Sequence, residues 1–202
     1  GTRMSRRKHH GERNMAARGT AVFTAFISMV ILLLAGAVPG HSQERDAPMA
    51  KTGLTVPKSL QAEHDAIHSA LVEATRAPGA VGTAAQALAE VLHPHFVREQ
   101  EIALPPLGLL APLASGTRLA DTEIAEALAM TDSLRRELPR MVEEHGRIRA
   151  AVDALRKVAT AERAAEAREL ADELALHAQT EEEVLYPAAL AVGDLLRVGR
   201  GR

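Results

Sequence analysis

The segment "HAQTEEEVLYP", residues 177 to 187, decides the fold of this 202-residue chain because the sequence contains a second version of it. "HFVREQEIALP", residues 95 to 105, aligns with it at an offset of 82, which places Glu181 on Glu99. A second pair aligns at an offset of 81, where "EHGRIRAAV", beginning at Glu144, lies over "EHDAIHSAL", beginning at Glu63. The body of the chain is therefore predicted to be a pair of segments used twice.

The composition of the chain favours packed helices over sheets. Ala and Leu abound, 47% of residues are hydrophobic and only 2% are aromatic. Apolar spacing and Pro or Gly breaks predict helices over 59–76, over 83–104 with a kink at Pro94, over 121–158 with an interruption near Pro139, over 161–186, and in a short tail to Leu196. The apolar loop 105–120 is expected to fold back over one end. We therefore predict an all-α, antiparallel, up-down four-helix bundle over residues 58–196.

Charge divides the chain into a basic start and an acidic body. Residues 1–20 contain six Lys or Arg and one Glu, a net charge of +5, so the remainder carries −7 of the total of −2. An acidic body argues against nucleic acid as a partner because phosphates would repel it. The chain has no cysteine, which excludes disulfides and thiolate metal sites.

The basic start is followed by the uncharged run "AVFTAFISMVILLLAGAV", residues 21–38. A basic flank, an apolar run and small residues are the three parts of a secretory signal peptide. The run also reaches the roughly 18 residues at which a membrane span becomes feasible. We therefore expect residues 1–43 to be a signal peptide or an N-terminal membrane anchor helix, and residues 44–57 to be a linker. The protein is expected to be exported, to the periplasm or outside the cell, with any membrane contact made only by residues 21–38. The sequence does not indicate which protein, if any, it binds.

The duplicated segments also share side chains that can bind metal. Residues four apart on a helix differ by about 40° around its axis, so His95 and Glu99 present an imidazole and a carboxylate on one face. Buried groups of this kind need partners or a metal, and imidazole with carboxylate suits iron, and also manganese or zinc. Two carboxylates placed between two pairs of histidines can bridge two ions. The six residues expected to point inward are His64, His95, Glu99, His145, His177 and Glu181.

This pattern, with Tyr186-Pro187 closing the last segment, resembles the hemerythrin-like (HHE cation-binding) family over about residues 58 to 190. The resemblance implies a four-helix bundle around a non-haem di-iron centre, with the four histidines as terminal ligands and Glu99 and Glu181 as bridges. It implies a protein that binds or senses O2, NO or peroxide as an exported carrier, sensor or scavenger. The alternatives are a di-iron enzyme that breaks down peroxide or superoxide, and an iron storage or buffering protein.

Two positions of the ligand set stay open. Many family members have a second histidine one turn after the third-helix ligand, where this chain has Arg149; the repeat offers His68 as a candidate fifth histidine instead. A five-residue spacing from His177 would select Glu182 as the bridge, whereas the repeat favours Glu181.

The neighbours of these residues have simpler interpretations. Phe96 and Tyr186 are the aromatic residues expected near the site, and Tyr186 is most simply a packing residue at a helix end. His93 is expected to face away from the site. The glutamates beside the bridges, Glu101, Glu182 and Glu183, are most simply a solvated face.

Overall fold

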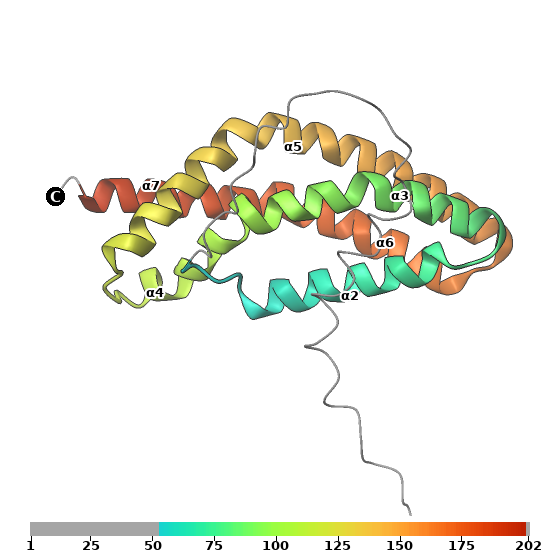
Figure 1. Cartoon of the computed structure of the whole chain (residues 1–202), viewed down its shortest axis with the longest axis horizontal. Helices are drawn as coiled ribbons and strands as arrows, with labels where there is room; N and C mark the ends of the chain where they lie inside the picture. The colour runs from blue at the N-terminus through green and yellow to red at the C-terminus, as the bar shows by residue number, and fades with distance from the viewer. Residues whose placement is uncertain (1–52, 201–202) are drawn as a thin grey trace, which may run out of the picture. The chain divides into compact units, whose positions relative to one another are not determined.

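The computed structural model describes residues 53–200, and within that range the secondary structure is entirely helical. Four helices form the bundle, namely α2 (Lys58–Thr75), α3 (Gly79–Arg98), α5 (Asp121–Glu162) and α6 (Ala165–Thr180). Successive helices run in opposite directions, as predicted (Figure 1). Each packs against two others, α2 and α5 both contacting α3 and α6, so the four enclose one core. The predicted signal or anchor helix over 1–43 lies outside the described residues, as does most of the linker.

The connections at one end of the bundle are helical as well. A π-helix, η2 (Glu99–Ala103), follows α3, and the predicted loop forms a 3₁₀-helix, η3 (Pro105–Leu109), and a short α4 (Leu110–Ala114). These pack on α5 and α7. A second π-helix, η4 (Glu181–Leu185), joins α6 to α7 (Tyr186–Arg200), so the tail helix is longer than predicted.

The predicted interruption of the third helix near Pro139 is wrong, because α5 continues through it for 42 residues. A proline removes one backbone donor from a helix and usually kinks or ends it. On either side of Pro139, however, Leu134 and Met141 are fully buried in the core around Tyr186. This packing holds both halves of α5 in one helix and outweighs the local preference of the proline.

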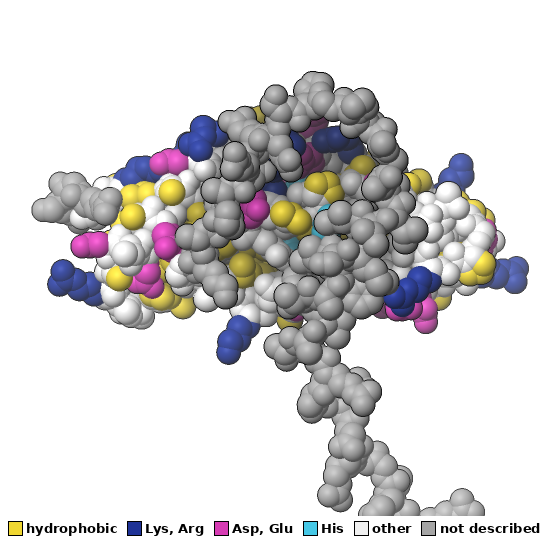
Figure 2. All heavy atoms as spheres, viewed as in Figure 1, with side chains coloured by type: hydrophobic (Ala, Val, Ile, Leu, Met, Phe, Trp, Pro, Cys, Tyr) yellow, Lys and Arg dark blue, Asp and Glu magenta, His cyan; other side chains and the backbone are white. Residues whose placement is uncertain are grey.

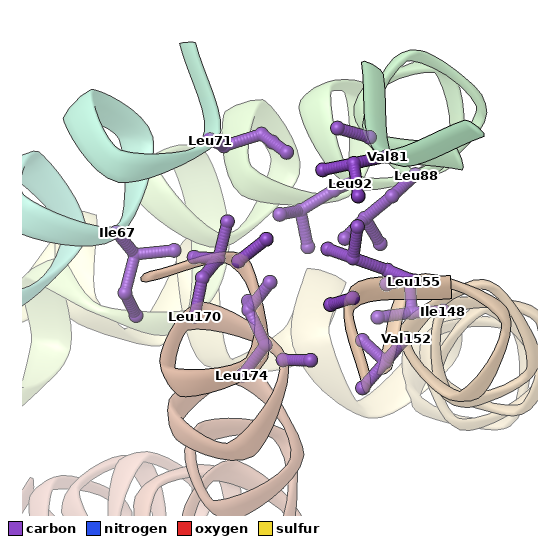
Figure 3. Close-up of a cluster of buried hydrophobic side chains, with 14 of the residues drawn as sticks. Ile67, Leu71, Val81, Leu88, Leu92, Ile148, Val152, Leu155, Leu170 and Leu174 are labelled. Carbon is purple, nitrogen blue, oxygen red and sulfur yellow. The ribbon is translucent and has the colours of Figure 1, made fainter. Parts of the chain in front are cut away.

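The apolar core consists of clusters on both sides of one level of the bundle. Figure 3 shows the larger cluster, in which Ile67, Leu88, Ile148 and Leu174 come from four different helices. A second cluster contains Ile102, Leu104, Leu107, Leu134, Met141 and Tyr186. On every helix of the bundle, the histidine of the repeated motif lies in sequence between residues of these two clusters. The polar level is therefore enclosed by apolar side chains in both directions.

The end of the predicted linker is packed against the bundle. The Gly53 backbone nitrogen donates a hydrogen bond to Glu126 at 2.8 Å, and Leu54 is buried in a third apolar cluster. Gly108 lies so close to this segment that a Cβ there would meet the Thr55 carbonyl oxygen at 2.2 Å, so the position requires glycine.

The outer faces of the helices carry charged side chains together with some exposed apolar ones, such as Leu176 and Leu195. Figure 2 shows basic and acidic side chains close to one another on the visible face. None of the helices in the described range is long and apolar enough to cross a membrane. The predicted span over 21–38 lies outside that range.

Candidate metal centre

The four histidines of the repeated motif come from four different helices and meet inside the bundle. His64 lies on α2, His95 in the last turn of α3, His145 on α5 and His177 in the last turn of α6. None exposes more than 3% of its surface. The two glutamates of the motif begin the π-helices and are equally buried. All six residues that the sequence places inward are therefore in the core.

Their ligand atoms form two groups that share both carboxylates. One group is His64, Glu99, His177 and Glu181, and the other is His95, Glu99, His145 and Glu181. Within each group the atoms lie within 4.8 Å of one another.

Glu181 shows the sharing most directly. Its Oε1 lies 2.7 Å from the Nε2 of His177 and 3.6 Å from that of His64, whereas its Oε2 lies 3.2 Å from the Nε2 of His145. One oxygen of the carboxylate thus faces each pair of histidines.

Several buried atoms of the centre have no hydrogen-bond partner among the described residues. They are both ring nitrogens of His64, the Nε2 of His177, one oxygen of Glu99 and the Oε1 of Glu181. His177 and Glu181 approach closely, but without the geometry of a hydrogen bond, as expected for two ligand atoms aimed at a common point between them. Buried polar atoms are rarely left without partners, because each costs about 1–3 kcal/mol. A metal ion fits this donor set, since it would satisfy all of these inward-facing atoms except the Nδ1 of His64.

Three further carboxylates hold the outer ring nitrogens of the histidines. The Nδ1 atoms of His95, His145 and His177 lie 3.1, 2.7 and 3.0 Å from Glu144, Glu182 and Glu63 respectively. Burial opposes ionisation of Glu144 and Glu182, but contacts with the histidines and with Arg140 or Arg149 lower the pKa of both carboxyl groups. An ionised carboxylate only accepts, so each Nδ1 donates its proton outward, and the Nε2 of each ring faces the centre, where a metal ion would take the place of a proton.

Sequence reasoning missed these outer partners. Two of the three outer carboxylates belong to the repeated Glu-His pairs of the sequence. Across the bundle, Glu63 contacts His177 and Glu144 contacts His95. The prediction that Glu182 belongs to a solvated face is wrong, since it is 28% exposed and accepts hydrogen bonds from His145 and Arg149. The spacing of residues along one helix does not show which residues of a neighbouring helix they will contact.

Tyr186 packs in the second apolar cluster at the start of α7, as predicted, but its hydroxyl also reaches the centre. Its hydroxyl donates a hydrogen bond to Oε1 of Glu99 at 2.5 Å and lies 3.2 and 3.4 Å from the Nε2 atoms of His145 and His95. Burial and the charges of Glu99 and Glu181 raise the pKa of Tyr186. On the other side of the centre, the Phe96 ring stacks on His64 with centroids 4.5 Å apart, which agrees with the expected aromatic lining.

Electrostatics of the metal-free centre favour bound protons. Burial lowers the pKa of His177, but its contacts with Glu181 and Glu63 outweigh burial and raise the pKa to about 9. Burial likewise opposes the net rise in the pKa of His95, which the carboxylates of Glu99 and Glu144 produce. Burial and the neighbouring Glu181 raise the pKa of Glu99. Burial opposes ionisation of Glu181, but its close contacts with His145, His177 and His64 outweigh burial and lower the pKa of Glu181.

His68 does not join the histidines of the centre. It is exposed and belongs to neither group of candidate ligand atoms. His93 is exposed as well, as predicted. Arg149, one turn after His145, reaches Glu182 at 2.7 Å.

Comparison with known proteins supports a metal-binding role. No curated protein and no solved structure matches the chain. The hemerythrin HHE cation binding domain matches residues 136–199, which contain His145, His177 and Glu181. The resemblance inferred from the duplicated motif is thereby confirmed for the second helix pair: residues 136–199 match the hemerythrin HHE cation binding domain, and their inward side chains form half of a buried His/Glu cluster suited to metal.

Proposed function

We propose that the protein holds two non-haem iron ions at this level of the bundle and binds or senses O2, NO or peroxide. The observation that carries the proposal is the position of Glu181, which presents one oxygen to His64 and His177 and the other to His145. A carboxylate placed in this way is suited to bridge two ions. Glu99 belongs to both groups and supports the same arrangement.

The donor set is compatible with iron, and the resemblance to the HHE family favours iron over other metals. Each ion would be bound by two imidazoles and by the shared carboxylates, a combination of nitrogen and oxygen ligands that suits iron, and also manganese or zinc. Such a set leaves coordination positions open, and bound iron supplies redox chemistry and a place for a small ligand there. The chain's own contribution is to hold the imidazoles by Glu63, Glu144 and Glu182 and to exclude water with apolar clusters on both sides.

We further propose that the protein acts after export, as a carrier, sensor or scavenger. The support is the sequence of residues 1–43, with its basic start and its apolar run. Mass spectrometry of the protein recovered from its source, together with cell fractionation, tests this. Full-length protein confined to the cytoplasm would contradict export.

Metal analysis and optical spectroscopy of the full chain test the di-iron centre. We expect two irons per chain and an absorption spectrum that changes when O2, NO or peroxide is added to the reduced protein. His177→Ala should lose metal, whereas His68→Ala, which removes an exposed histidine, should retain it. Iron-loaded protein whose spectrum responds to none of the three ligands would contradict the proposal. Sustained turnover of peroxide or superoxide would favour the enzymatic alternative, and fast exchange of iron with chelators would favour storage.

A further inference from the structure

At one position of the duplicated motif, directly after the π-helix, the two halves carry side chains of different chemistry. The offset of 82 that aligns the two segments places Tyr186 on Leu104. Each residue directly follows a π-helix, and each backbone N–H bonds to the carbonyl of the bridging glutamate five residues earlier. Both side chains are fully buried. The same place in the repeat therefore supplies a phenol in one half and an apolar side chain in the other.

The phenol oxygen lies among the ligand atoms of one group. Its neighbours are Oε1 of Glu99 at 2.5 Å, Nε2 of His145 at 3.2 Å and Nε2 of His95 at 3.4 Å, and the two imidazole nitrogens are themselves 2.8 Å apart. Both imidazoles are held at Nδ1 by outer carboxylates, so their Nε2 atoms face the centre. Four nitrogen and oxygen atoms of the kind that bind metal thus converge on one place.

The spacing of these atoms agrees with ligands around one ion. Nitrogen and oxygen ligands bind such ions at about 2.0–2.2 Å, so two ligands at right angles lie about 3 Å apart. The three separations from the phenol oxygen range from 2.5 to 3.4 Å and surround that value. The phenol proton is used by the hydrogen bond to Glu99, yet the oxygen also lies within 3.4 Å of both imidazole nitrogens.

We propose that the phenol oxygen of Tyr186 is a ligand of the ion held by His95 and His145, so that the two metal positions are chemically inequivalent. This inference rests on the proposed iron centre. Binding of Fe(III) to the phenol forms an Fe–O bond and breaks the O–H bond, and the proton leaves to solvent. Tyr186 is then a fifth protein ligand of this ion, beside His95, His145 and the two glutamates. The duplicated sequence had instead suggested His68, on the first helix pair, as the additional ligand.

The composition of the chain makes the test unambiguous, because Tyr186 is its only tyrosine. Iron(III) bound to a phenolate has a broad visible charge-transfer band, and excitation within that band enhances the ring vibrations of the phenolate in the resonance Raman spectrum. We expect both signals from the full chain loaded with Fe(III). Tyr186→Phe should lose them completely while it keeps two irons per chain. Phe96→Leu, which alters the aromatic ring beside His64 in the other half, should keep them.

The outcomes separate this inference from the function on which it rests. Iron-loaded wild-type protein without phenolate signals would overturn the ligation and leave the di-iron centre standing, with Tyr186 as a hydrogen-bond donor to Glu99. Protein that takes up no iron would overturn both. The wild-type spectrum alone gives this answer, so the test does not depend on the folding of the variant.

Discussion

Removal of the Glu144 carboxylate tests how strongly the outer partners support the metal centre. Glu144 is 12% exposed and accepts a hydrogen bond from Nδ1 of His95 at 3.1 Å, while Arg140 holds its other oxygen at 3.0 Å. In Glu144→Ala, the His95 ring loses the group that fixes its orientation and makes Nε2 more basic. Loss of such a partner typically weakens metal binding about 10- to 100-fold, which is about 1.4–2.7 kcal/mol.

The burial of the three outer carboxylates ranks their effects. Glu144 is the least exposed at 12%, Glu182 is intermediate at 28%, and Glu63 is exposed at 46%, so water replaces the carboxylate of Glu63 most easily. We therefore expect the loss of affinity to fall from about 100-fold in Glu144→Ala toward about 10-fold in Glu63→Ala.

Anaerobic competition for Fe(II) against a chromophoric chelator measures these affinities. Glu143→Ala is the matched control, because it removes the same charge from the next residue of α5, which is exposed. The control should bind iron as the wild type does. Equal affinities of Glu144→Ala and Glu143→Ala would refute the reasoning, because the effect of Glu144 would then be no more than its charge.

Three further predictions follow from the same structure. In the metal-free protein the pKa of His177 is raised to about 9, so below that pH a metal ion must displace a proton from this ring. Metal affinity should therefore rise about tenfold per pH unit from 7 to 8. A metal affinity that competition assays find constant over this pH range would count against a histidine ligand. Lowering the pH below about 5 to 6 should release the metal, because protons then compete for all ligating nitrogens; full iron content at pH 4 by elemental analysis would contradict this. Leu88→Ala, which empties a fully buried position in the larger core cluster, should lower the free energy of unfolding in urea by about 2–5 kcal/mol, whereas Leu176→Ala, at a position 65% exposed, should change it by less than about 0.5 kcal/mol.

The direction in which a side chain points from its helix is a local property, and the sequence predicted it well. His95 and Glu99 lie four residues apart, and their repeat at His177 and Glu181 has the same spacing, so each pair faces the core as predicted. The local signal failed at Pro139, because contacts made by distant residues keep α5 continuous there.

Tyr186 shows a second limit of local reasoning. In a regular α-helix a residue five positions after Glu181 points about 140° away from it, so helical spacing alone does not place Tyr186 beside the bridging glutamates. The π-helix between them has a wider turn, and this returns the phenol to the inward face.

The sequence by itself determined the helical repeat and the six inward-facing residues, because helical periodicity and duplication are both properties of the order of residues along one chain. Only the tertiary structure decided which residues meet across the bundle. It paired Glu63 with His177 and Glu144 with His95, placed Tyr186 beside Glu99, and left His68 on the surface. The physical reason is that spacing sets the angle of a side chain about its own helix axis, whereas the partner it meets depends on how neighbouring helices are rotated and shifted when their apolar faces pack.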